Sequence, residues 1–364
     1  MKTKLLLVGG FLGAGKTSLL WEAAKRLMQQ DKKVALITND QASELVDSAL
    51  LQNEGLDVAE VSGSCFCCNF PGFADAIKQL RLKSAPDVII AEPVGSCADL
   101  SATIIQPLKK FYQADIEVAP FTVLADPARL LPIMKGDNGG LHQDAAYIYH
   151  KQLEEGDVIL ITKTDAYPKA EMDALQALVA SKMVGTCVRK VSSLTGDGVD
   201  DWLSDMLSRN DSGRRLLDID YDIYAHGEAV LGWLNGTLLL KGEETDWDAF
   251  AKNLLTAFNN RFLDKKAGIG HVKIIVENGA KYTIGNLAGD GNLSIRHTAG
   301  SSQQAKLIVN ARVEMTPDEL DRIVREEITV LLADNLTEEV LAWKYLMPGR
   351  PNPTHRFTEI VEPK

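Results

Sequence analysis

A glycine-rich stretch near the first residue restricts the fold of this chain more than any other feature. Residues 10–17 read GFLGAGKT and fit the pattern G-x-x-x-x-G-K-[S/T]. The apolar run 5–8 predicts a strand directly before it, and a segment with helical periodicity begins near Thr17. Glycines let backbone N–H groups turn toward a phosphate, and the N-terminus of the following helix adds positive potential. The stretch is therefore predicted to be a phosphate-binding loop.

Two residues of this loop, and three outside it, carry the chemistry expected of a magnesium–nucleotide site. Lys16 is expected to reach the β- and γ-phosphates, and the Thr17 hydroxyl to ligate Mg²⁺. Glu92 and Asp40 each follow an apolar run, which predicts carboxylates at the ligand-binding edge of a sheet, and Gly95 suits a backbone contact to the γ-phosphate. We predict Lys16, Asp40 and Glu92 as catalytic residues, and Thr17, Asp40 and Glu92 as Mg²⁺ ligands. Which carboxylate orients the attacking water stays open.

Two later segments indicate the base. Residues 162–165, TKTD, resemble the [N/T]-K-x-D element of GTPases, whose aspartate accepts hydrogen bonds from the guanine N1–H and exocyclic amine. Adenine lacks this pair of donors, so a buried Asp165 would reject it, while the Lys163 stem would lie along the base. Residues 192–198, SSLTGDG, resemble the loop that places a backbone amide against the guanine oxygen. We therefore expect GTP or GDP. The predicted nucleotide ligands are Gly10, Gly13, Ala14, Gly15, Lys16, Thr17, Ser18, Gly95, Thr162, Lys163, Asp165, Ser193 and Leu194.

Three of the five cysteines, Cys65, Cys67 and Cys68, lie within four residues. Three thiolates at this spacing suit a soft or borderline cation such as Zn²⁺, and they leave a fourth position open for a metal that must be passed on. Buried inert cysteines, a redox pair, and a structural site completed by a distant residue are the alternatives. Cys97 and Cys187 are expected to pack as small hydrophobic residues.

The rest of the pattern predicts two domains and a tail. Apolar runs alternate with helical segments over the first two hundred residues, which is typical of an α/β fold with a mostly parallel sheet covered by helices. We assign residues 1–212 to this domain. Residues 213–335 are predicted to be a smaller α+β, ferredoxin-like domain, with strands within 229–240, 271–277 and 306–313 and helices over 247–262 and 317–332. Residues 336–364 are expected to form a C-terminal helix or irregular tail.

Charge and hydropathy exclude several classes of partner. Lysines and arginines number 39 against 50 aspartates and glutamates, for a net charge of −11, so no nucleic-acid partner is expected. No apolar run approaches the roughly 18 residues of a membrane span, and no signal peptide or membrane association is expected. An odd number of cysteines, three of them clustered, favours a cytoplasmic protein that uses its thiols chemically.

With these motifs in view, the first two hundred or so residues resemble the nucleotide-binding domain of the CobW/HypB/UreG family. The resemblance rests on GGFLGAGKTS over 9–18, on the C-x-C-C run that begins at Cys65, and on residues 38–40, TND. It implies a P-loop NTPase fold of the SIMIBI class, GTP hydrolysis, nucleotide-dependent homodimerisation, and zinc, cobalt or nickel as cargo. The chain departs from the family at Ser64, often glycine, and at Pro93, where a hydroxyl residue is usual. Its C-terminal domain also lacks a histidine-rich tract.

The leading hypothesis is a GTP-hydrolysing metallochaperone that holds zinc, or else cobalt or nickel, at the C-x-C-C motif and couples its release to the nucleotide state. Its partner would be a client metalloprotein or a cofactor-dependent enzyme. One alternative is a GTPase chaperone for a cobalamin- or corrinoid-dependent enzyme, in which the cysteines hold a structural metal. Another is a zinc-responsive scaffold that binds the nucleotide without hydrolysing it.

Overall fold

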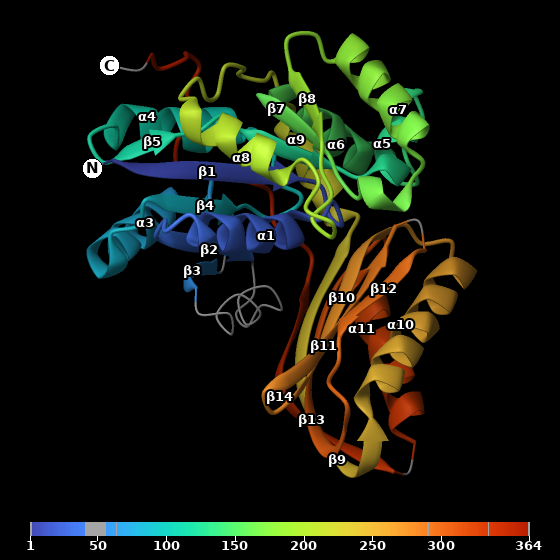
Figure 1. The fold of residues 1–364 in the computed structure, drawn as a ribbon. Coiled ribbons are helices and arrows are strands. Elements are labelled where there is room, and N and C mark those ends of the chain that lie inside the picture. Colours follow the sequence, from blue (N-terminus) through green and yellow to red (C-terminus); the bar gives the residue numbers. More distant parts are fainter. Residues whose placement is uncertain (1, 41–55, 63, 290, 334, 363–364) are drawn as a thin grey trace.

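The computed structural model describes residues 2–40, 56–62, 64–289, 291–333 and 335–362, which form two regions with a separate sheet in each (Figure 1). The C-terminal sheet lies against the end of the N-terminal region at which the phosphate-binding loop is found. None of the helices within the described residues has the length and apolar character needed to cross a membrane.

All strand pairs in the N-terminal sheet are parallel. Its central strands are mostly apolar and are buried along their whole length, because helices cover both faces of the sheet. The strand order is β3-β2-β4-β1-β6-β7-β8, and β5 also pairs with β1. The strands are β1 (Thr3–Gly10), β2 (Val34–Asp40), β3 (Asp57–Ser62), β4 (Val88–Glu92), β5 (Ile116–Val118), β6 (Thr122–Ala125), β7 (Val158–Ile161) and β8 (Cys187–Lys190). The predicted parallel α/β sheet is confirmed.

Helices form a layer on each face of this sheet. α1 (Lys16–Gln29) and α8 (Val199–Ser208) pack on one face, where they bury Leu6, Val8 and Ile90. The other face packs against α3 (Phe70–Ser84), η1 (Ser101–Ile105), α4 (Gln106–Phe111), α5 (Pro127–Met134), α6 (Gln143–Glu155), α7 (Lys169–Lys182) and α9 (Tyr221–Ala229). A short turn of helix, η2 (Thr164–Ala166), follows β7.

The C-terminal region is an antiparallel sheet with two helices on one face. Its elements are β9 (Gly232–Asp246), α10 (Trp247–Asp264), β10 (Ile269–Asn278), β11 (Lys281–Ala288), β12 (Leu293–His297), β13 (Ser301–Val313), α11 (Pro317–Leu332) and β14 (Leu336–Leu346). The strand order is β12-β11-β10-β13-β9-β14. Without β11 and β12, the order along the chain is βαββαβ, which is the expected ferredoxin-like arrangement. Side chains of α10 and α11 fill the core on one face, which leaves the other face toward the N-terminal region.

Several elements differ from the sequence-based expectation. Residues 336–346, expected in a helix or irregular tail, form the edge strand β14, which pairs with β9 along its length. Its side chains are mostly exposed, so the strand is held by backbone pairing and lacks a clear apolar alternation. The strand expected from residue 229 begins at Gly232, because residues 221–229 form α9, whose N-cap Asp220 accepts hydrogen bonds from Asp222 N and Ile223 N. β3, β5, β11, β12, α4 and α5 were not predicted.

Beyond β14 the chain returns to the N-terminal region as an irregular segment, residues 347–362, drawn in red in Figure 1. Backbone hydrogen bonds attach this segment at two places: Thr354 N donates to Cys67 O at 2.9 Å, and Phe357 N donates to Ala102 O at 3.0 Å. Val361 N also donates to the Gln106 side chain at 2.8 Å. The end of the chain therefore lies across the loop that carries the cysteines.

Candidate functional site

The phosphate-binding loop has the backbone geometry that its glycines predict. Gly10 has a φ of +126°, and a Cβ there would lie 2.4 Å from Leu124 O, so only glycine fits without displacing β6. Gly15 is also in the left-handed region, with a φ of +91°, and α1 begins at the next residue. The Lys16 ammonium donates to Gly10 O at 2.8 Å and to Phe11 O at 3.2 Å. The lysine is thus folded over the loop in which a phosphate would lie.

This loop forms one wall of a cavity of about 1090 Å³. Most of the predicted nucleotide ligands line it: Gly13, Gly15, Lys16, Thr17, Ser18, Gly95, Thr162, Lys163, Asp165, Ser193 and Leu194. Glu92, predicted as a Mg²⁺ ligand, lines it as well. Two predicted ligands, Gly10 and Ala14, are not among the residues that line the cavity. The Ala14 carbonyl accepts a hydrogen bond from Thr162 Oγ1 at 2.9 Å, which ties the loop after β7 to the phosphate-binding loop. Two chain segments distant in sequence therefore meet in one site.

The predicted Mg²⁺ ligands lie together where the structure describes them. Thr17 Oγ1 donates to the Glu92 carboxylate at 3.2 and 3.4 Å, and both side chains are buried. A hydroxyl and a carboxylate this close form the oxygen donor set that Mg²⁺ prefers. Asp40 ends β2, but its side chain lies outside the described part of the chain. Lys273 from the C-terminal sheet also donates to Thr17 Oγ1, at 3.3 Å.

The two loops predicted to bind the base, within residues 162–165 and 192–198, line the cavity, but the aspartate of the first loop is more exposed than expected. Asp165 is exposed to the cavity, whereas the sequence argument assumed a buried carboxylate, and its Oδ1 accepts a hydrogen bond from Ser192 Oγ at 2.5 Å. Ser192 in turn accepts from the Leu194 and Thr195 backbone amides, at 3.2 and 3.1 Å. The Lys163 ammonium forms an ion pair with Asp126, so its stem borders the cavity. The second loop thus orients the carboxylate of the first.

The opposite wall of the cavity comes from the C-terminal sheet, and sequence reasoning missed it entirely. His271 and Lys273 of β10 lie opposite Arg312 and Asn310 of β13 in the antiparallel register. Because side chains alternate along a strand, these residues face the cavity while their neighbours pack on α10 and α11. Arg296 of β12 extends this basic surface and donates to Ser18 Oγ at 3.3 Å. Single polar residues separated by apolar ones in a strand give no contiguous motif.

His271 is held neutral in this wall. Burial lowers its pKa well below the usual value, and the charges of Lys273 and Arg312 lower it further. Its Nε2 lies 2.8 Å from Asn310 Oδ1. Positive charge in the wall is therefore carried by the lysine and arginines, while the imidazole contributes a neutral polar edge.

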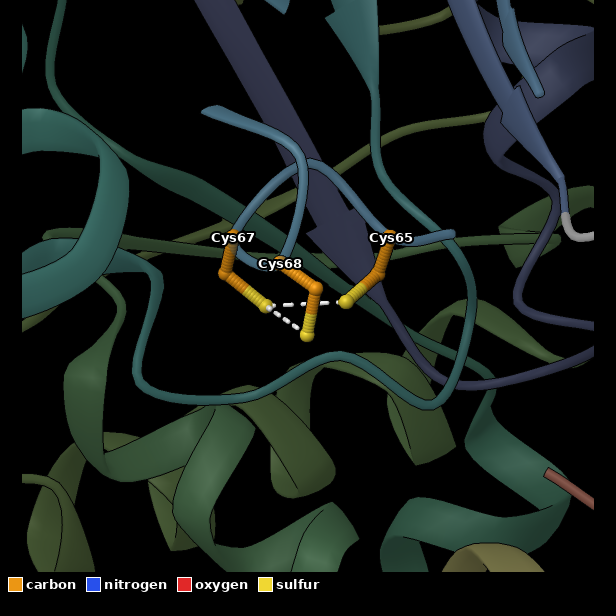
Figure 2. A group of neighbouring side chains, drawn as sticks. All are labelled: Cys65, Cys67 and Cys68. Carbon is orange, nitrogen blue, oxygen red and sulfur yellow. Dashed lines mark hydrogen bonds between the residues drawn. The ribbon is translucent and has the colours of Figure 1, made fainter. Parts of the chain in front are cut away.

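The three clustered cysteines form a compact group just before α3 (Figure 2). Cys65 Sγ lies 2.9 Å from Cys67 Sγ, and Cys67 Sγ lies 3.9 Å from Cys68 Sγ. Cys65 and Cys67 are buried, and Cys68 is half-buried. Tetrahedral Zn²⁺ with Zn–S bonds of about 2.3 Å places its sulfur atoms about 3.8 Å apart. The group therefore suits Zn²⁺ after the closer pair opens by about 1 Å, well within side-chain adjustment.

Thiol chemistry in this group centres on Cys65. Hydrogen bonds from the thiols of Cys67, Cys68 and Cys97 lower the pKa of Cys65. The shared thiolate in turn raises the pKa of Cys68 to about 11. The N-terminus of α3, directly after the group, adds positive potential that favours thiolates. A lowered pKa favours the thiolate, which is the form in which cysteine binds metals.

Asn39 connects the cysteine loop to the nucleotide cavity. Its Nδ2 donates to Val61 O at 2.7 Å and to Ser64 O at 2.8 Å, and its Oδ1 accepts from Phe66 N at 2.9 Å. The same residue lines the cavity near Glu92. One amide therefore fixes the chain from the end of β3 to the loop on which the cysteines lie. The sequence marks this asparagine only as part of the TND segment and does not reveal the connection.

The structure also brings together a second group of metal-ligating side chains that the sequence did not predict. His142, Asp144 and His226 have ligand atoms within 4.8 Å of one another. His142 and His226 are both exposed, and Asp144 forms an ion pair with His226. The histidines come from the start of α6 and from α9, so their distance in sequence hid the pairing. This exposure of both histidines contrasts with the cysteine group, in which Cys65 and Cys67 are buried.

Fold and site together define a protein with a phosphate-binding loop on a parallel α/β sheet, a nucleotide-sized cavity and a nearby thiol cluster. The family model for the CobW/HypB/UreG nucleotide-binding domain matches residues 4–185, half of the chain. The chain belongs to this family, as the motifs implied.

Individual relatives are more distant. The zinc chaperone YeiR of Escherichia coli (strain K12) is 28% identical over 178 residues, which are 48% of this chain and 50% of that protein. Zinc-regulated GTPase metalloprotein activator 1 of Schizosaccharomyces pombe is 25% identical over 200 residues, 53% of this chain and 46% of that protein. The chain thus spans about half the length of the curated relatives it matches. The solved structure of Zn(II)-bound YjiA GTPase from E. coli superposes with a TM-score of 0.40 at 16% identity, over 91% of this chain and 99% of that one.

Proposed function

We propose that this protein is a GTP-hydrolysing metallochaperone that binds a transition metal at Cys65, Cys67 and Cys68 and couples its release to the nucleotide state. The observation that carries the proposal is Asn39, which lines the nucleotide cavity and makes three hydrogen bonds to the segment around the cysteines. A change at the phosphate end of the cavity thereby reaches the metal ligands through one side chain. Switches of other P-loop proteins act through similar short connections.

Within this proposal the cavity binds GTP and Mg²⁺. Lys16 contacts the β- and γ-phosphates, Thr17 and Glu92 supply oxygen ligands to Mg²⁺, and Gly95 offers a backbone N–H to the γ-phosphate. Asp40 is proposed as a further Mg²⁺ ligand and catalytic residue. Lys273, now beside Thr17, moves toward the phosphates when Mg²⁺ occupies this position.

The remaining predicted ligands are proposed to hold the base and the rest of the nucleotide. Asp165 and Lys163 read guanine, and the backbone at Ser193 and Leu194 contacts its oxygen. Thr162 supports the phosphate-binding loop from below, through its bond to Ala14. Gly10, Gly13, Gly15 and Ser18 complete the phosphate site.

Zinc is the cargo that we propose first, with cobalt or nickel as alternatives. The sulfur-only ligand set favours a borderline or soft cation, and the names of two relatives refer to zinc. A client metalloprotein or cofactor-dependent enzyme is the proposed recipient. A homodimer that forms with nucleotide is a further part of the proposal.

The test is a zinc and cobalt titration of reduced, metal-free protein, performed with Mg·GDP and with a non-hydrolysable GTP analogue. We expect metal affinity to differ at least tenfold between the two nucleotides, which corresponds to about 1.4 kcal/mol of coupling. Linkage requires metal to change the ratio of the affinities for the GTP analogue and GDP by the same factor. Cys67→Ala should weaken metal binding, and Lys16→Ala should remove the response to nucleotide while leaving the metal site intact.

Equal metal affinity in both nucleotide states would overturn the coupling and leave the cysteines as a structural metal site. Metal binding without any GTP turnover, with or without metal, would overturn the assignment as a hydrolase. The two failures are separable because the first is read in the titration and the second in phosphate release.

A further inference from the structure

The second group of metal-ligating side chains lies on the surface of the N-terminal region, where α6 and α9 pack side by side (Figure 1). His142 and Asp144 lie at the start of α6, and His226 belongs to α9. One ligand atom of each residue lies within 4.8 Å of the other two. His226 Nδ1 forms an ion pair with Asp144 Oδ2, and His142 Nδ1 lies 3.9 Å from the same oxygen atom. Two imidazole nitrogens therefore converge on one carboxylate oxygen.

Close backbone packing holds these side chains together. Gly227 follows His226, and a Cβ at this glycine would lie 2.4 Å from Asp144 O, so only glycine lets α9 approach the start of α6 this closely. His142 is also fixed from the C-terminal region, because its backbone N–H donates to Glu314 Oε1 at 2.5 Å. Its Nδ1 accepts a hydrogen bond from Asp144 N at 3.2 Å and so caps α6. The fold thus assembles the group without help from a ligand.

The donor set has the composition of a zinc-type site. A surface ion pair needs one imidazole and one carboxylate, but this group holds a second imidazole, and its two rings lie at 76° with centroids 5.4 Å apart, so they do not stack face to face. Tetrahedral Zn²⁺ with bonds of about 2.1 Å to nitrogen and oxygen places its ligand atoms about 3.4 Å apart. The separation of 3.9 Å between His142 Nδ1 and Asp144 Oδ2 is within about 0.5 Å of this value. Imidazole also suits nickel and copper, so the expected cation belongs to this class.

The two helices that carry the group also hold the loop between β4 and η1, residues 93–100, at the nucleotide cavity. The buried Gln152 of α6 donates to Gly95 O at 3.0 Å. Glu228 of α9, two residues after His226, accepts a hydrogen bond from Ser96 Oγ at 2.5 Å, and both side chains are buried. Gly95 itself lines the cavity. The position of α9 relative to α6 therefore determines how firmly this loop is held.

We propose that His142, Asp144 and His226 form a second metal site, which takes a divalent cation of the zinc class and bridges α6 to α9. Its donors are two imidazole nitrogens and one carboxylate oxygen, so it differs from the thiolate group in chemistry as well as in exposure. A fourth position is left to water. Metal bound here fixes α9 against α6 and thereby stiffens the loop that both helices hold. The inference goes beyond the proposed function and holds whether or not the cysteines carry a cargo.

The experiment is a zinc titration of the metal-free full chain with Cys65→Ser, Cys67→Ser and Cys68→Ser, a thiol-free variant that removes the competing thiolates. We expect one zinc ion per chain, and X-ray absorption should show only nitrogen and oxygen ligands at about 2.0–2.1 Å. Adding His226→Gln should weaken this binding at least about tenfold, because one of three protein ligands is lost. The matched control is His150→Gln, which replaces another histidine of α6 outside the group and should leave zinc affinity unchanged.

Two further readouts complete the test. The wild type should bind two zinc ions per chain and His226→Gln only one, so the inference stays testable even where the thiol-free variant fails to fold. Zinc should also slow amide hydrogen exchange at residues 95–98 of the thiol-free variant at least about threefold, and His226→Gln should abolish this effect. Zinc binding that His226→Gln leaves unchanged would overturn the site, and bound zinc without slower exchange would overturn the bridge. Neither result affects the proposed function, which is read at the thiolates.

Discussion

The two walls of the nucleotide cavity contrast in how they are built. The N-terminal wall consists of loops at the carboxyl ends of parallel strands, where backbone amides, glycines and contiguous motifs converge. The C-terminal wall is the face of an antiparallel sheet, and its polar residues come one at a time from β10, β12 and β13. The first wall supplies the geometry of a phosphate site, whereas the second supplies positive charge on long side chains.

The difference indicates that two parts of the molecule act separately: the N-terminal wall selects the nucleotide, and the C-terminal wall covers the cavity. Under the proposed function, Asp165 and the phosphate-binding loop define what the cavity accepts, and each is fixed by hydrogen bonds. Lys273 and Arg296 each reach across the boundary between the two regions, where Lys273 donates to the Thr17 hydroxyl and Arg296 to the Ser18 hydroxyl. Substitutions in the first wall should therefore change specificity, while those in the second should change affinity for the charged end of the nucleotide.

The largest effect is expected for Asp165→Ala in the N-terminal wall. In the proposed function Asp165 accepts two charge-assisted hydrogen bonds from guanine. Their loss should lower the preference for GTP over ATP about 100-fold, or about 3 kcal/mol. Competition binding of the two nucleotides measures this preference. Asp201→Ala, an exposed aspartate of α8, is the matched control and should retain it. An unchanged preference in Asp165→Ala would show that the base is read elsewhere.

A smaller effect is expected for Lys273→Met in the C-terminal wall. Loss of its ammonium should weaken GTP binding about tenfold, with little change in the GTP-to-ATP preference, because a single charge near the phosphates is removed. Lys306→Met is the control: this lysine of β13 pairs with Glu277 and does not line the cavity. Isothermal titration in Mg²⁺ measures both variants. Tighter binding by Lys273→Met would contradict the comparison and identify this lysine as a competitor of Mg²⁺.

Arg296→Ala at the rim of the same wall should have a weaker effect. The side chain is exposed, so its contribution to GTP affinity is expected to be about threefold at low salt and to vanish at high salt. Arg322→Ala, on the outer surface of α11, provides the control. Affinity measured across a salt series tests the expectation. A salt-independent loss would mean that Arg296 contacts the nucleotide in a desolvated position.

The smallest effect concerns pH and His271. Burial and the neighbouring positive charges lower the pKa of this histidine in the folded protein, so only the unfolded chain takes up a proton as the pH falls below about 6.5. Stability should therefore decrease as the pH falls below this value, and His271→Gln should make the decrease shallower. Melting temperatures of metal-free, nucleotide-free protein between pH 7.5 and about 5 measure the slope. Identical slopes in both proteins would exclude His271 as the titrating group.

The same contrast explains how much of the site could be predicted from the sequence. The first wall was predictable because each motif is contiguous and lies between a strand and a helix. The second wall was not, since His271 and Lys273 occupy alternate positions of an otherwise ordinary strand, and only register places them opposite Arg312. The open position of Asp165 depends on its partner Ser192, and no local pattern indicates this contact.

Around the cysteines the limit was distance along the chain. The C-x-C-C spacing identified three thiols, but the hydrogen bonds that Asn39 makes to the segment around them depend on how the chain folds back after β3. The same limit applies to the fold. The α/β alternation and the ferredoxin-like region were predictable from the periodicity of apolar residues. β14 was not, because an exposed edge strand depends on its pairing with β9 more than on its own apolar pattern.

The irregular segment after β14 has a mechanical consequence. Two stretches of chain, not one, cross between the regions: one enters β9 and the other leaves β14 and ends beside α4. With two covalent connections, the C-terminal region can rotate about the line that joins them, but it cannot move away from the N-terminal region as a whole. Rotation that lifts the C-terminal sheet from the cavity would pull on the returning segment, which holds Cys67 O and Cys68 O through Thr354. Opening of the cavity and strain at the cysteine loop thus become one movement.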